Sequence, residues 1–247
     1  MNLSTNVKTY FGKAEKFIID VFFPKICAVC GEEGTFLCKK CAEGLPLFKY
    51  PLCPNPACQK KLIFGRVCEN CRQASGLTRF FAALPYQDKT TREMLWQFKY
   101  LGAKDLAFAF GKILTEFLAK CGFESIFDKK KTILVPVPLF QARLKDRGFN
   151  QSEEIAKIIG EYFKIPARID ILAKIKDTAA QAEIKSPEQK QKNILGVFSC
   201  KNPDAVLGKI VILIDDVYTT GSTMKECARV LRASGAKEIW GITIARG

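Results

Sequence analysis

The chain has 247 residues, which is enough for one full core and a smaller module, and no run reaches the roughly 18 apolar residues that a membrane span needs. Its formal net charge of +14 favours a polyanionic partner such as nucleic acid, or phosphorylated ligands, although a lysine-rich surface that only aids solubility is the alternative. It contains no histidine, which excludes histidine-based acid–base catalysis and histidine metal ligands.

The first 25 residues predict an amphipathic helix. Residues 17–23, FIIDVFF, are mostly apolar and follow lysines, but Asp20 interrupts the run and no small-residue cleavage site follows. A secretory signal peptide has a longer apolar stretch and such a site. We therefore expect a cytoplasmic protein with no integral membrane span.

Residues 26–78 are rich in cysteine, and eight of the 11 cysteines lie in two quartets. The first quartet is Cys27, Cys30, Cys38 and Cys41, and the second is Cys53, Cys58, Cys68 and Cys71. Short spacings between thiolates are typical of tetrahedral zinc sites, and four cysteine ligands leave no open position, so we predict two structural Zn²⁺ ions in a double zinc ribbon. One ion for each quartet is the simpler pairing, and interleaved pairing stays open.

Residues 79–247 predict one α/β domain. The expected strands are 80–84, 132–138, 169–172, 209–215 and 239–244. The expected helices are 91–100, 104–120, 150–162, one from Ser186-Pro187 and 222–234. Residues 173–186 fit neither period and predict a mobile loop. The alternation of apolar strands with helices indicates a parallel sheet flanked by helices on both faces.

The segment VILIDDVYTTGST, residues 211–223, predicts a ligand site at the carboxyl end of a strand. Backbone N–H groups of the loop Val217–Gly221 and of the following helix start can bind a phosphate. Asp215 and Asp216 suit ribose hydroxyls, or a Mg²⁺ ion held on them. A simple Thr/Ser helix cap would not explain the paired acids, so we expect a sugar-phosphate ligand.

The stretch IDDVYTTGST resembles the phosphoribosyl pyrophosphate (PRPP) signature of type I phosphoribosyltransferases. The resemblance implies that Asp215 and Asp216, as the catalytic acids, bind the ribose hydroxyls. It also implies 5′-phosphate binding by Val217, Tyr218, Thr219, Thr220, Gly221, Ser222 and Thr223, with Mg²⁺ accompanying PRPP.

Nearly the whole chain resembles the ComF family of competence proteins. The resemblance lies in VPVPLFQARLKDRGFNQSEEIA (135–156), FKYLG (98–102), QKNILGVF (191–198) and the cysteine-rich N-terminus. Members commonly carry an arginine where this chain has Lys190, which keeps the charge but loses the bidentate fork. The residues expected near pyrophosphate are Lys99, Arg143, Arg147, Asn150 and Gln151, and loop 173–186 is expected to close as a lid.

Three functions follow from this resemblance and from the charge. The first is a protein of DNA uptake in natural transformation that binds PRPP and single-stranded DNA. The second is an active phosphoribosyltransferase with a nitrogen acceptor that the sequence does not identify. The third is an adaptor that docks a competence helicase or other DNA-uptake proteins.

Overall fold

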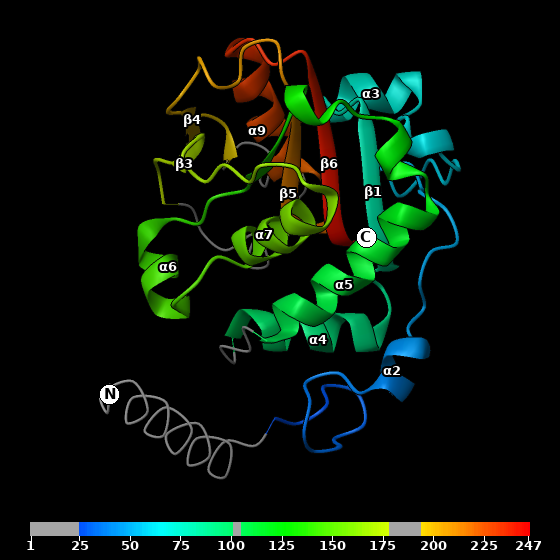
Figure 1. The fold of residues 1–247 in the computed structure, drawn as a ribbon. Coiled ribbons are helices and arrows are strands. Elements are labelled where there is room, and N and C mark those ends of the chain that lie inside the picture. The colour runs from blue at the N-terminus through cyan, green and yellow to red at the C-terminus, as the bar shows by residue number, and fades with distance from the viewer. Residues whose placement is uncertain (1–24, 101–104, 178–193) are drawn as a thin grey trace, which may run out of the picture. The chain divides into compact units, whose positions relative to one another are not determined.

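The computed structural model describes residues 25–100, 105–177 and 194–247 (Figure 1). The chain divides into two compact units, Met1–Gly44 and Leu45–Gly247. This division falls inside the range 26–78 that the sequence groups as one double ribbon, and the boundary expected at residue 79 stays a prediction. The helix expected over 1–25 lies outside the described residues except for its last position. The helix expected from Ser186-Pro187 and the part of the expected lid beyond Asp177 also lie outside them.

The described part of the smaller unit, residues 25–44, consists of turns and one short helix. Ile26 forms an antiparallel bridge with Glu33, and helix α2 spans Lys39–Glu43. Cys27 is the one buried residue of this segment. Because so little apolar surface is buried, a bound metal would have to supply most of the folding energy here.

The larger unit is built on a parallel sheet with the strand order β1-β6-β5-β2 (Figure 1). Its strands are β1 (Arg79–Pro85), β2 (Thr132–Pro136), β5 (Ile210–Tyr218) and β6 (Glu238–Arg246). Their central residues are buried in continuous runs, as in sheets covered on both faces. The predicted parallel sheet is therefore confirmed.

The strand expected over 169–172 differs in place and partner. Strand β3 spans Leu172–Lys174 and pairs antiparallel with β4 (Phe198–Cys200) in a separate two-stranded sheet. Strand β4 was not predicted, and two residues of the expected mobile loop belong to β3. A pairing between segments 26 residues apart sets this register, and three-residue strands are too short to show an alternating pattern.

Helices cover the sheet, with three short 3₁₀ turns between elements. The helices are α3 (Glu69–Ser75), α4 (Lys89–Tyr100), α5 (Asp105–Lys120), α6 (Gln141–Arg147), α7 (Gln151–Phe163) and α9 (Ser222–Ala233). The turns are η1 (Ile63–Gly65), η2 (Phe123–Ser125) and η3 (Lys129–Lys131). Helices α4, α5, α7 and α9 confirm the prediction, whereas α6 was missed because it buries no residue and has no apolar period.

Neighbouring residues of β1 show the two faces of the sheet. Phe80 belongs to a core that includes Met224 and Cys227 of α9. Phe81 instead packs edge to face on Phe123, with ring centroids 5.5 Å apart. Side chains alternate across a strand, so two separate cores cover the sheet. Helices α5 and α7 contact each other and the sheet, and α9 contacts β4, β5 and β6.

Candidate functional site

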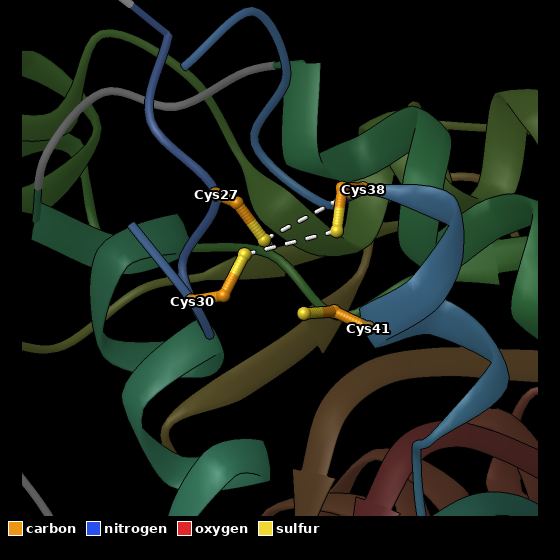
Figure 2. A group of neighbouring side chains, drawn as sticks. All are labelled: Cys27, Cys30, Cys38 and Cys41. Carbon is orange, nitrogen blue, oxygen red and sulfur yellow. Dashed lines mark hydrogen bonds between the residues drawn. The ribbon is translucent and has the colours of Figure 1, made fainter. Parts of the chain in front are cut away.

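The first cysteine quartet, called centre 1, brings its four sulfur atoms within 4.8 Å of one another. Figure 2 shows the side chains of Cys27, Cys30, Cys38 and Cys41 pointing inward. The Sγ atoms of Cys30 and Cys38 are 3.8 Å apart. Zinc–sulfur bonds of about 2.3 Å place tetrahedral sulfurs roughly 3.8 Å apart. Centre 1 therefore fits a zinc ion.

The second quartet, called centre 2, has the same geometry in the larger unit. The Sγ atom of Cys68 lies 3.7 Å from that of Cys53 and 3.6 Å from that of Cys58. Cys71 completes the group, again within 4.8 Å. Each quartet is consecutive in sequence, so the sequential pairing applies and the interleaved alternative is excluded. Among the described residues no other metal-ligating group of this kind forms.

A buried arginine supports a negatively charged metal group at centre 2. Arg246 is 3% exposed, and its Nε atom has no hydrogen-bond partner in the described part of the chain. Its Nη2 donates to the carbonyl of Asn55, which lies between Cys53 and Cys58 in the chain, at 3.3 Å. A guanidinium stays charged when buried, so it needs a compensating charge nearby. Four thiolates with a bound Zn²⁺ would carry a net charge of −2 and would supply it.

The predicted acid pair lies inside strand β5, because this strand continues to Tyr218. The Ser152 hydroxyl at the start of α7 donates to Asp215 Oδ1 at 3.2 Å, and the Asp216 N–H donates to the same oxygen at 2.9 Å. Lys99 Nζ of α4 lies 2.5 Å from Asp216 Oδ2. Helices α4 and α7 thus meet β5 at the carboxyl edge of the sheet.

The electrostatics distinguish the members of this group. Burial and the neighbouring charge of Asp216 raise the pKa of Asp215 from its ordinary value of 3.8 to about 7. Burial opposes the charge of Lys99, but Asp216 overcomes this and raises the pKa of the lysine. At neutral pH the edge therefore holds one ion pair beside a carboxyl group that is poised to gain or lose a proton.

Residues 219–223, the TTGST loop, follow β5 and lead into α9. A small hollow is lined by Asp215, Val217, Tyr218, Thr219, Gly221, Ser222, Thr223 and Met224. Thr220 Oγ1 and Ser222 Oγ form a hydrogen bond of 2.9 Å. Gly221 is the N-cap of α9 with φ +74°, so the positive end of the helix dipole adds to the hollow. Val217 and Tyr218, expected in the loop, are the last residues of the strand.

The residues expected near pyrophosphate divide into two kinds. Arg143 and Arg147 lie on α6, and Arg147 stacks on the Tyr100 ring at 5.2 Å. The side chains of Asn150 and Gln151 are buried at the start of α7. Asn150 is the N-cap of α7: its Oδ1 accepts from the Ser152 N–H, and its Nδ2 donates to the Val137 carbonyl.

Gln151 makes equally internal contacts. Its Nε2 donates to the Phe98 carbonyl at 3.3 Å, and its Oε1 accepts from Arg147. Asn150 and Gln151 therefore hold α7 against α4 and the end of β2, whereas Arg143 and Arg147 lie on α6. The contacts expected between these four residues and pyrophosphate stay predictions.

Two features of the larger unit were missed by the sequence reasoning. Trp96 and Tyr100, one turn apart on α4, are 55% and 58% exposed, and their ring centroids lie 5.8 Å apart. Their spacing of four was a visible signal, but it does not tell a surface pair from a core pair. Arg246 gave no local signal, because its contact with centre 2 spans most of the chain.

No helix among the described residues has both the length and the apolar character to cross a membrane.

Comparison with known proteins identifies the family. The family described as "Phosphoribosyl transferase domain" matches residues 109–247, more than half of the chain. Competence protein ComFC of Bacillus subtilis is 30% identical over 224 residues, covering 85% of this chain and 84% of the relative. Competence protein F of Haemophilus influenzae is 27% identical over 228 residues, covering 85% and 98%. The DNA utilization protein YhgH of Escherichia coli K12 is 26% identical over 233 residues, covering 88% and 96%. The chain therefore belongs to the ComF family of competence proteins and carries a phosphoribosyl transferase domain.

Proposed function

We propose that this protein binds PRPP with Mg²⁺ and single-stranded DNA, and that it acts in the cytoplasm on DNA taken up by the cell. The observation that carries the proposal is the meeting of an acid pair, a lysine and a hydroxyl-rich helix start at one edge of the parallel sheet. Ligands of such sheets bind at this edge. The names of the relatives, competence protein and DNA utilization protein, support the cellular role.

In this proposal the TTGST loop binds the 5′-phosphate of PRPP. Its hydroxyl groups and the first N–H groups of α9 provide donors, and the helix dipole favours an anion. Gly221 has no side chain, so the phosphate can approach the backbone closely. Among the described residues no cationic side chain lines this hollow, which suits recognition of a monoester by hydrogen bonds.

Asp215 and Asp216 are the end for the ribose diol and its metal. Carboxylate oxygens are ligands that Mg²⁺ prefers, and the ion would neutralise the charge that builds up where pyrophosphate joins the ribose. Lys99 now pairs with Asp216. When the diol and its metal bind, this long side chain is expected to leave Asp216 and turn toward pyrophosphate. Arg143 and Arg147 add positive charge from α6, and Asn150 and Gln151 position α7.

The two cysteine centres hold one structural zinc ion each. Their sulfur spacing and the full set of four thiolates support closed sites. Zinc also lowers the formal charge of the protein from +14 to about +10, because each occupied centre carries −2. A positive surplus remains for a polyanion.

Exposed aromatic side chains support single-strand binding. Trp96 and Tyr100 form a tilted pair on α4, and the Arg147 guanidinium stacks on Tyr100. Tyr50, another exposed aromatic residue, has Lys61 over its ring at 4.3 Å. Proteins that bind single strands combine stacking rings with cations in this way. We assign the Trp96–Tyr100 pair the role of a stacking platform.

A second function, phosphoribosyl transfer to a nitrogen acceptor, is favoured by the match of residues 109–247 to the phosphoribosyl transferase domain family. Pyrophosphate release that depends on an acceptor, and that Asp215→Asn abolishes, would establish transfer. No release with a panel of bases and amines, in the presence of demonstrated PRPP binding, would leave the binding function alone.

Calorimetric titration of the full chain with PRPP and Mg²⁺, with and without a single-stranded oligonucleotide, tests the main proposal. We expect PRPP to bind, Asp216→Asn to weaken binding at least tenfold, and Asp204→Asn, an exposed carboxylate in a distant turn, to bind like the wild type. A gel shift at physiological salt tests the DNA part. Absence of PRPP binding would reject both the PRPP-binding function and phosphoribosyl transfer. Absence of a gel shift would reject binding to single-stranded DNA.

A further inference from the structure

Centre 2 and the TTGST loop are physically close, although about 150 residues separate them in sequence. Cys53 and Cys71 belong to the same buried core as Tyr218, the last residue of β5 before the loop. Tyr218 is 6% exposed, and its ring packs on Phe80 with centroids 4.8 Å apart.

The Tyr218 ring also lies against the loop. A Cβ atom added at Gly221 would overlap the Tyr218 hydroxyl, so the ring occupies the space directly beneath this glycine. Tyr218 thus belongs to the core that contains Cys53 and Cys71, and it also fills the space beside the turn that opens α9. A change in the position of the centre must displace either the ring or the loop, because protein interiors are close-packed.

Arg246 forms a second connection. It pairs with Tyr218 in the β5–β6 ladder, and the next residue, Gly247, donates its N–H to the Tyr218 carbonyl at 2.8 Å. The Arg246 side chain contacts the Cys53–Cys58 segment by donating to the Asn55 carbonyl. Arg246 thus joins the Cys53–Cys58 segment to the strand that leads into the loop.

We propose that centre 2 is a structural support of the TTGST loop, with Tyr218 as the contact and Arg246 as the charge partner of the zinc–thiolate group. Loss of zinc leaves a buried guanidinium without its compensating charge, so the Cys53–Cys58 segment and Arg246 separate. Tyr218 then loses its support, and the loop opens. Centre 1 belongs to the other unit and serves as the comparison. The meaning of this inference for ligand binding rests on the proposed function, but the structural coupling does not.

Amide hydrogen exchange of the zinc-loaded full chain tests the coupling without any ligand. In Cys58→Ser we expect faster exchange of the amides of residues 217–224 and loss of one of two zinc ions. Cys121→Ser, which changes a cysteine outside both quartets in the same unit, should exchange like the wild type. Cys30→Ser should also lose one ion while leaving the loop protected. Unchanged loop exchange in Cys58→Ser would overturn the proposal.

Two further variants keep the test decisive if Cys58→Ser does not fold. Arg246→Gln should weaken zinc binding at one centre by about tenfold to a hundredfold in competition with a chromophoric chelator, as other outer-shell changes do. Its matched control is Arg232→Gln, whose exposed side chain donates to the Gly76 carbonyl. Tyr218→Leu should retain both zinc ions yet lose loop protection. Equal zinc affinities in Arg246→Gln and Arg232→Gln would contradict the role of Arg246.

These readouts separate this inference from the proposed function. If the wild type does not bind PRPP while Cys58→Ser still loosens the loop, the proposed ligand is wrong and the coupling stands. If PRPP binds equally well with centre 2 disrupted and the loop stays protected, the ligand stands and the coupling is wrong.

Discussion

The two cysteine centres have the same arrangement of ligands, yet they differ in how much of the surrounding chain is buried. In each, the third cysteine is the N-cap of a short helix, and the fourth is the third residue of that helix. Cys38 and Cys41 hold these places at α2, and Cys68 and Cys71 hold them at α3. Because the ligands are arranged alike, the difference between the centres comes from the residues that surround them.

Helix α2 buries none of its residues, whereas α3 buries Cys71 and Ser75 and contacts α9. The end of α3 lies so near α9 that a Cβ atom on Gly76 would come 3.3 Å from Ala228. Centre 2 is also flanked by buried Leu62, Val67 and Leu77, which belong to the core of the larger unit. The comparison teaches that one metal motif can organise a small module or complete a large core, depending on the apolar residues beside it.

The largest expected effect compares Cys68→Ser with Cys38→Ser. Loss of a structural zinc site removes several kcal/mol, and centre 2 lies in the core of the larger unit. We expect Cys68→Ser to lower the main thermal unfolding transition by on the order of 10 °C. Cys38→Ser should leave this transition within about 2 °C. Equal shifts in calorimetry would break the distinction between the centres.

Gly221→Ala tests whether the loop and the core around centre 2 form one body. The position has φ +74°, and the new methyl group would overlap Tyr218. We expect PRPP affinity to fall at least 30-fold, equivalent to about 2 kcal/mol. Gly208→Ala imposes similar backbone strain at φ +69° with no neighbour within 4 Å, and is the matched control. If Gly221→Ala and Gly208→Ala bind PRPP with equal affinity, the loop accommodates the new methyl group and is not held in place by Tyr218.

Asp215→Asn separates the effect of this carboxyl group on the stability of the larger unit from its effect on PRPP binding. Above its ordinary pKa of 3.8 this acid ionises in the unfolded chain, but the folded protein keeps its proton up to pH about 7. Its contribution to stability therefore declines from pH ~4 to ~7 and stays low at higher pH.

We expect Asp215→Asn to raise the thermal midpoint at pH 8 by on the order of 5 °C, to change it little at pH 4, and to abolish PRPP binding. In the wild type, PRPP affinity should weaken as the pH falls below 7, because Mg²⁺ and the diol need the carboxylate. A midpoint that is equally shifted at both pH values would contradict the assigned cause.

The smallest effects concern DNA. Trp96→Ala and Tyr100→Ala should each weaken binding to a single strand by about tenfold, since stacking contributes 1–3 kcal/mol for each base. The control is Phe108→Ala, an aromatic residue of α5 that is 69% exposed. If these variants bind normally and Cys30→Ser does not, the smaller unit would be the DNA-binding part.

Much of this architecture could be predicted because its signals are local. Apolar periodicity located the four strands of the parallel sheet and helices α4, α5, α7 and α9. Cysteine spacing defined both quartets, since ligands two residues apart can share one ion in any context. The hydroxyl-rich loop after Asp215 and Asp216 likewise predicted a ligand site from adjacent residues alone.

Other features could not be predicted, because they depend on packing between distant segments. Strand β4 has three residues and exists through its pairing with β3. The Lys99–Asp216 ion pair and the contact of Arg246 with centre 2 join residues more than a hundred positions apart. No periodicity or spacing encodes such contacts.

The sequence by itself therefore determined the fold class, the eight cysteines that make up the two quartets and the chemical character of the loop. The tertiary structure alone decided that one centre belongs to a small unit and the other to the core beneath that loop. The physical reason is that metal chelation and phosphate binding need only a few neighbouring groups, whereas mechanical support requires buried surfaces that meet when the chain folds.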